Sequence, residues 1–152
     1  PPFTLQADDG ATISSLELVG KPTVLRFYPY PNEALTYALV EQLPKLLRLG
    51  VHVFAISNER VTAAATDNTI PPSHRLTDPT GEVITAYDAM GLHRIYGQLL
   101  PGILPSVVLI GADGRVVRRW PKVVFRNHFA EVTERVKRLV AKGPAPKASR
   151  RS

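Results

Sequence analysis

The chain has 152 residues, a formal net charge of +6 and no cysteine. This length is typical of a single domain, and the missing thiols exclude disulfide bonds, thiolate metal sites and cysteine catalysis within this sequence. No apolar run approaches the ~20 residues needed to cross a bilayer, so we expect no membrane span.

The first third of the chain alternates between strand and helix patterns. Two short extended pieces on either side of the turn at 7–10 predict a leading hairpin. The β-branched and aromatic run at 22–28 predicts a buried strand, and the nearly all-apolar run at 51–57 predicts a strand covered on both faces. Between these runs, leucines recur at helical spacing over 32–49, and Gly50 is a natural helix end.

The remainder of the chain predicts two helices, a pair of strands and a final helix. A short helix is expected over 59–68. Asp78 as N-cap, followed by Pro79, predicts a second helix that ends at Gly91. The segment 106–120 reads as two strands joined by a tight Asp-Gly turn. The final helix is predicted by an apolar stripe of Phe129, Val132, Val136, Leu139 and Val140.

This order of elements, βαβ followed by αββα, predicts a domain of the α/β class over residues 1–141. We expect a central mixed sheet with helices on both faces, which is the thioredoxin-like architecture. The remaining residues, 142–152, contain lysines and arginines but no acid, and predict a disordered basic tail. Such a tail is a candidate for contact with an anionic surface.

Several stretches carry a family resemblance. The strand "VLRFYP" ends in Phe-Tyr-Pro, and "GVHVFAIS", "LTDPTGEVITAYDAMGL" and "VVLIGADGRVVRRW" follow it. In these stretches the chain resembles a peroxiredoxin of the alkyl hydroperoxide reductase/thiol-specific antioxidant family. The resemblance implies a Pro-x-x-x-Thr-x-x-Cys motif, in which Pro29 is kept. Glu33 stands at the threonine position, and Thr36 stands at the position of the peroxide-reducing cysteine.

A comparison with thioredoxins points to the same place. Pro44 follows Thr36 by eight positions, as the helix-kinking proline of thioredoxins follows the first cysteine of Cys-x-x-Cys. Leu39 then stands at the second cysteine position. Pro105 matches the cis-proline that faces the active site in thioredoxin-like relatives, where many peroxiredoxins carry an arginine. The resemblance therefore implies a retained scaffold without its redox chemistry.

Other side chains offer no replacement chemistry. The hydroxyl of Thr36 is undissociated near neutral pH, and we interpret it as a small residue that caps or packs at a helix start. A lone carboxylate such as Glu33 at a helix N-terminus is interpreted as a complement to the helix dipole. We expect no metal and no cofactor, because the histidines are widely separated and lack ligand spacing. These histidines are His52, His74, His93 and His128.

Two hypotheses about function follow. The first is a redox-inactive peroxiredoxin-like protein, not an enzyme, that serves as a structural or accessory interaction subunit of a larger assembly. The alternative is a thiol peroxidase or thioredoxin-like oxidoreductase whose cysteines were replaced, or whose chemistry a partner supplies. Threonine and leucine at the two positions argue against deliberate replacement, for which serine or alanine is usual.

The expected partners are other protein subunits. The chain begins without methionine and is rich in Pro, Ala and Arg, so we expect an organellar protein of the mitochondrion or plastid after removal of a targeting segment. An organellar ribosome or a membrane energy-converting complex would suit it. Apolar and aromatic residues around the former site form the first candidate contact surface, with 99–104 read as a loop. They are Tyr30, Tyr37, Leu99, Leu100, Ile103 and Leu104. The second candidate surface is a basic strand with Arg115, Arg118 and Arg119.

Overall fold

The structure is a computed structural model, and it describes residues 1–29, 33–59 and 70–142. Nearly all of the helix expected over 59–68, and nearly all of the basic tail, lie outside the described residues. The same is true of Tyr30.

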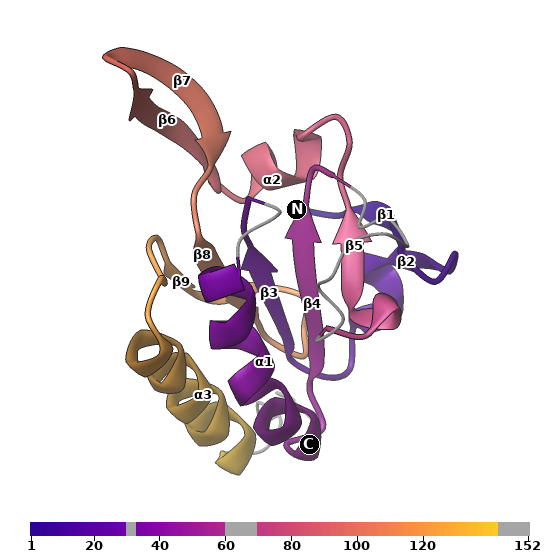
Figure 1. Ribbon diagram of the computed structural model, residues 1–152. Coiled ribbons are helices and arrows are strands. Elements are labelled where there is room, and N and C mark those ends of the chain that lie inside the picture. Colours follow the sequence, from indigo (N-terminus) through magenta and orange to yellow (C-terminus); the bar gives the residue numbers. More distant parts are fainter. Residues whose placement is uncertain (30–32, 60–69, 143–152) are drawn as a thin grey trace.

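The main sheet contains seven strands in the order β2-β1-β5-β4-β3-β8-β9 (Figure 1). Strands β3, β4 and β5 run parallel to one another, whereas β1, β2, β8 and β9 pair antiparallel with their neighbours. This mixed sheet, together with its helices, confirms the predicted α/β class. The strand bounds are Thr4–Ala7 (β1), Thr12–Ser14 (β2), Thr23–Phe27 (β3), His52–Ser57 (β4), Arg75–Thr77 (β5), Ser106–Ile110 (β8) and Val116–Trp120 (β9).

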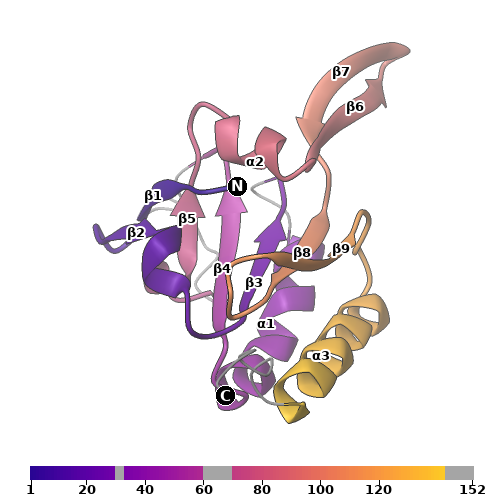
Figure 2. The same ribbon diagram turned by 180° about the vertical axis from the view of Figure 1, so that it is seen from behind.

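Both faces of the sheet are covered. The long helices α1 (Glu33–Arg48) and α3 (Arg126–Ala141) lie side by side on one face (Figures 1 and 2). The other face is covered by the 3-10 turn η1 (Ser15–Leu18) and the short helix α2 (Glu82–Ala86). The core beneath α1 and α3 includes Val24, Leu39, Leu46, Val107, Phe129, Val132 and Val136. Full burial of an aliphatic or aromatic side chain of this size contributes about 1.5–3 kcal/mol.

The predicted helix over 79–91 is wrong in its extent. Helix α2 covers only Glu82–Ala86, and its N-cap is Gly81, whose φ of 76° is left-handed. Asp78 lies outside the helix, but its buried carboxylate accepts a hydrogen bond from the backbone N–H of Ile84 at 2.9 Å. Gly91 does not end a helix, because it belongs to strand β6.

A second sheet consists of one hairpin, the β6–β7 arm, formed by β6 (Met90–Ile95) and β7 (Gln98–Ile103). The arm projects away from the main sheet in both ribbon views (Figures 1 and 2). The expected loop at 99–104 is therefore mostly strand. Tyr96 and Gly97 connect the strands with φ angles of 50° and 80°, the two positive values that a type I′ turn requires.

The arm joins the body through a facing pair of glycines, Gly91 and Gly102. A Cβ atom on Gly91 would lie 2.6 Å from the Leu104 side chain, and one on Gly102 would lie 2.6 Å from the His93 ring. Both positions therefore favour glycine, because neighbouring side chains fill the space that a Cβ would need. This packing supports the arm where it leaves the domain.

Candidate functional site

The residues that the family resemblance singles out lie around one edge of the sheet. Register pairs Phe27 of β3 with Ser106 of β8, so Pro105 lies beside the carboxyl end of β3. Pro29 follows that strand and is half-buried, and α1 begins a few residues later. The predicted coincidence of Pro29, Pro105 and the start of α1 is consistent with this topology.

The two positions at which the resemblance implies cysteines are buried. Thr36 is 4% exposed in the first turns of α1, and Leu39, one turn further along, is 1% exposed. Glu33 is the first residue of α1, and its side chain is outside the described residues. A hydroxyl buried at this depth is not placed to attack a soluble substrate.

Sequence reasoning missed a buried cation in this region. Arg26, in the middle of β3, is 1% exposed and is among the largest fully buried side chains of the protein. Its Nη2 donates to the carbonyl of Leu35 in α1 at 3.5 Å, and its guanidinium lies 5.4 Å from the centre of the Phe129 ring. Burial lowers the pKa of Arg26 to about 10, an effect that the nearby Tyr28 partly opposes. The sequence signal that could have identified Arg26 is a charged residue inside an otherwise apolar strand.

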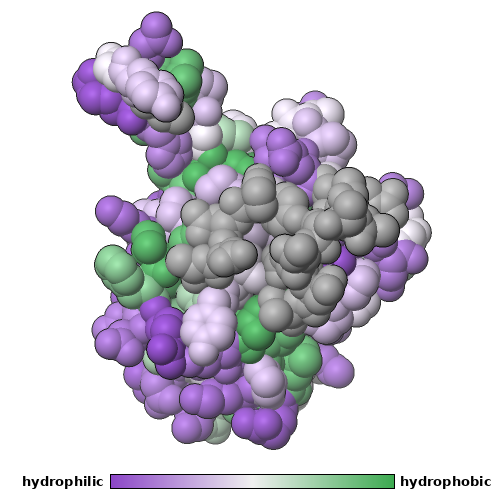
Figure 3. Space-filling model, viewed as in Figure 1, coloured by the Kyte–Doolittle hydropathy of each residue, from purple (hydrophilic) through white to green (hydrophobic). Residues whose placement is uncertain are grey.

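The apolar candidates divide between the arm and the body. Leu99 and Leu100 lie on the arm and are exposed, whereas Ile103 is buried in the core under α2 and Leu104 is half-buried. Figure 3 shows hydrophobic surface on the arm and where it joins the body. Of the apolar residues predicted to form a contact surface at 99–104, Leu99 and Leu100 are therefore the exposed ones.

Tyr37 is half-exposed and faces α3. The guanidinium of Arg126 lies 5.4 Å from the centre of its ring, and Arg126 also forms a bidentate ion pair with Glu41 of α1. The hydrogen bonds from Arg126 hold the pKa of the Glu41 carboxyl below its usual value. Tyr37 thus belongs to a polar cluster that links the two long helices.

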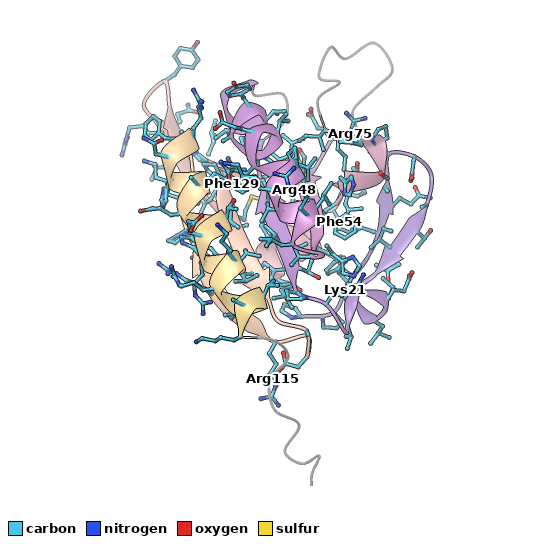
Figure 4. The ribbon with its side chains drawn as sticks, turned by 90° about the horizontal axis from the view of Figure 1, so that it is seen from below. Lys21, Arg48, Phe54, Arg75, Arg115 and Phe129 are labelled. Atoms are coloured by element: carbon cyan, nitrogen blue, oxygen red, sulfur yellow. The ribbon has the colours of Figure 1, made fainter. Side chains whose placement is uncertain are left out.

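The basic candidates on β9 differ in their availability. Arg119 donates from Nε to the carbonyl of Tyr87 at 3.3 Å and from Nη2 to the carbonyl of Asp88, so it holds the end of α2. Arg118 stacks 4.8 Å from the Trp120 ring centre. Arg115 is exposed at the tip of the β8–β9 connection (Figure 4). Only Arg115 and Arg118 are open to a partner.

The described residues form neither a metal-ligand cluster nor a membrane-spanning helix. Among the described residues, no three His, Asp or Glu side chains gather as metal ligands, and no helix is long and apolar enough to cross a membrane. A cavity of about 270 Å³ lies elsewhere, where Phe3 and Tyr87 meet Leu16, Val19 and Gly114. None of its lining residues belongs to α1.

Comparisons with known proteins agree with this geometry. The AhpC/TSA family model matches residues 1–119. The bcp protein of Coxiella burnetii is 32% identical over 144 residues, covering 90% of this chain and 94% of that protein. Peroxiredoxin Bcp of Bacillus subtilis is 28% identical over 149 residues, covering 93% of this chain and 94% of that protein.

Solved structures share the fold. Peroxiredoxin Q of Xanthomonas campestris superposes with a TM-score of 0.78 at 21% identity, covering 91% of this chain and 92% of that one. Peroxidoxin BcpB of Mycobacterium tuberculosis superposes with a TM-score of 0.71 at 18% identity, covering 91% of this chain and 94% of that one. These likenesses confirm the thioredoxin-like fold, and the family match spans most of the sequence. Although it carries no cysteine, the chain therefore belongs to the AhpC/TSA family.

Proposed function

We propose that this family member performs no thiol chemistry and acts as an accessory subunit that binds another protein through the β6–β7 arm. The 152 residues contain no cysteine, and Thr36 is buried at the position where the family resemblance implies one. A sulfenic acid intermediate needs a thiolate, so the family's reaction has no starting group here. The main support for a role in protein–protein interaction is the projecting β6–β7 arm with its exposed apolar side chains.

The side chains of the arm favour a partner. Leu92, Tyr96 and Leu99 are each more than half exposed, and Leu100 is 40% exposed. An isolated two-stranded sheet is marginally stable in water, and a further strand or a packed surface stabilises it. The register places Leu92 and Leu99 on one face of the hairpin and Leu100 on the other. A partner that holds the arm on both faces would therefore bury apolar area and stabilise the arm.

The backbone of the arm has one open edge. In a type I′ hairpin the residues flanking the turn form a hydrogen-bonded pair, and pairs then alternate along the strands. Leu92 and Pro101 form a non-hydrogen-bonded pair, so their backbone N–H and C=O groups point away from the partner strand. Pro101 has no N–H to offer there, so β7 is blocked and β6 is available to an added strand.

The experiment compares two leucines of equal exposure. Leu100 on the arm is 40% exposed and Leu47 at the far end of α1 is 41% exposed. We expect Leu100→Glu to release the protein from the assembly recovered with the wild-type chain, because a carboxylate would be buried at the contact. Leu47→Glu should assemble normally. Circular dichroism would establish that both variants stay folded.

If both variants assemble like the wild type, the arm is not the contact. Tyr37→Glu, and charge reversal at Arg115 and Arg118 on the basic strand, would then test the remaining candidate surfaces. Release by Leu47→Glu alone would move the contact to the far end of α1.

A further inference from the structure

Arg26 is a charged side chain in the protein core, and none of the acidic side chains that the structure describes pairs with it. Its cross-strand neighbours are Ala55 on β4 and Val107 on β8, neither of which has a side-chain acceptor. The Phe129 ring from α3 covers it, pointing into the space between the two long helices (Figure 4). The guanidinium therefore lies in an apolar layer between the sheet and the helices.

The hydrogen bonds of Arg26 are incomplete. Nη2 has the long 3.5 Å contact to the Leu35 carbonyl, whereas Nε and Nη1 are buried without a partner. No salt bridge joins Arg26 to an acid anywhere in the described part of the chain. A guanidinium stays protonated near neutral pH even with its pKa lowered to about 10, so the site carries a full positive charge.

The position of this charge increases the demand for an anion. Leu35 is the third residue of α1, so the guanidinium lies at the positive end of the helix dipole. The dipole therefore adds to the positive potential and does not offset it. A buried charge without a counter-charge or hydrogen-bond partners is strongly unfavourable, and proteins ordinarily pair such groups.

We propose that Arg26 binds a small, planar, singly charged oxyanion of the carboxylate type, between β3 and the first turns of α1. A planar carboxylate matches the planar guanidinium, and each edge of the guanidinium retains one nitrogen without a partner. The anion must be small, of the size of formate or bicarbonate, because Arg26 is 1% exposed. This site gives the domain a ligand without redox chemistry, and it does not depend on the interaction proposed for the arm.

The test uses the full chain and sodium formate, with sodium chloride at equal ionic strength as the reference. We expect formate to shift the Arg26 Nε–H resonance, assigned by its absence from Arg26→Lys, along a saturable curve. The thermal midpoint should rise over the same concentrations. The thermal response should be lost in Arg26→Met, and both responses should be retained in Arg48→Met, which alters an exposed arginine at the other end of α1.

Three results would overturn the proposal. The first is an Nε–H resonance that formate and chloride shift equally, since that is general screening. The second is a thermal response that survives in Arg26→Met. The third is a formate response that appears only in Glu33→Gln, because the chain would then supply the carboxylate itself. If Arg26→Met fails to fold, the wild-type Nε–H titration with the Glu33→Gln comparison decides the question.

Discussion

At the scale of single residues, the position at which the resemblance implies a reactive group holds a packed side chain. Thr36 stands where the family resemblance places a cysteine, and it is buried in the first turns of α1. Leu39 is buried at the second position, and Arg26 brings a charge beneath the same helix. A thiol introduced at position 36 would therefore lie buried among packed side chains, beside the helix turn that Arg26 contacts.

We therefore expect Thr36→Cys to remain inactive toward hydrogen peroxide in a coupled thiol-reductant assay, as the wild type should be. The side chain at position 36 is only 4% exposed, so a soluble reagent cannot reach a sulfur placed there without local opening. Alkylation of Thr36→Cys by iodoacetamide at neutral pH should therefore be about tenfold slower or more than that of Tyr37→Cys. Tyr37 is the adjacent, half-exposed position.

Peroxide turnover by the wild-type chain above a heat-treated control would contradict the redox-inactive assignment directly. Alkylation of Thr36→Cys as fast as Tyr37→Cys would show that the position is open in solution.

At the scale of elements, the N-terminal hairpin is tied to the sheet by a buried ion pair. Arg75 Nε of β5 lies 3.0 Å from Asp8 Oδ2, and their side chains are 10% and 4% exposed. The hydroxyl of Thr77 donates to the other Asp8 oxygen at 3.2 Å. The pair joins β5 to the residue that follows β1, two strands far apart in the chain.

Removing one charge of this pair should be costly, because it leaves the other charge buried. We expect Asp8→Asn to lower the free energy of unfolding by about 3 kcal/mol or more, measured by urea denaturation. The neighbouring Asp9→Asn is the control, since Asp9 is exposed and an amide oxygen can still accept from the backbone of Ala11. Its effect should stay within about 0.5 kcal/mol. Equal effects of the two changes would mean that the ion pair contributes nothing.

Elements with a strong, regular pattern were predictable from the sequence. The strand expected at 22–28 and the helix expected at 32–49 are β3 and α1, because apolar spacing and end signals agree there. The final helix is α3 for the same reason. The helix expected at 79–91 was wrong because Asp78 caps from a distance through Ile84, with Gly81 as the actual N-cap.

The arm was missed because its local signals are weak or contrary. Its turn is Tyr96-Gly97 rather than the common Asn-Gly pair, and Pro101 in β7 argues against a strand. Arg26 was missed for a different reason. A strand pattern shows that a position is buried, but the partners of a buried charge come from other strands and helices.

At the scale of the whole molecule, the domain is a covered sheet with one projection. The two long helices and the α2 side close both faces of the main sheet, and the arm extends beyond them (Figures 1 and 2). The thioredoxin-like fold is kept, and the two sites proposed here lie at the start of α1 and on the arm.

Pro101 limits how far strand addition can go. A hairpin with two open edges could pair at both, and each new copy would offer another edge, so that chains would grow into fibres. With β7 blocked, one added strand at β6 completes the arm and ends the growth. We expect Pro101→Thr to open the second edge and produce higher oligomers that increase with concentration in sedimentation velocity, whereas Pro44→Ala, at an exposed position in α1, should not. An unchanged sedimentation profile for Pro101→Thr would mean that this edge is closed by something other than proline. If the oligomers do form, the pyrrolidine ring of Pro101 is what keeps the protein in finite complexes and prevents polymerisation.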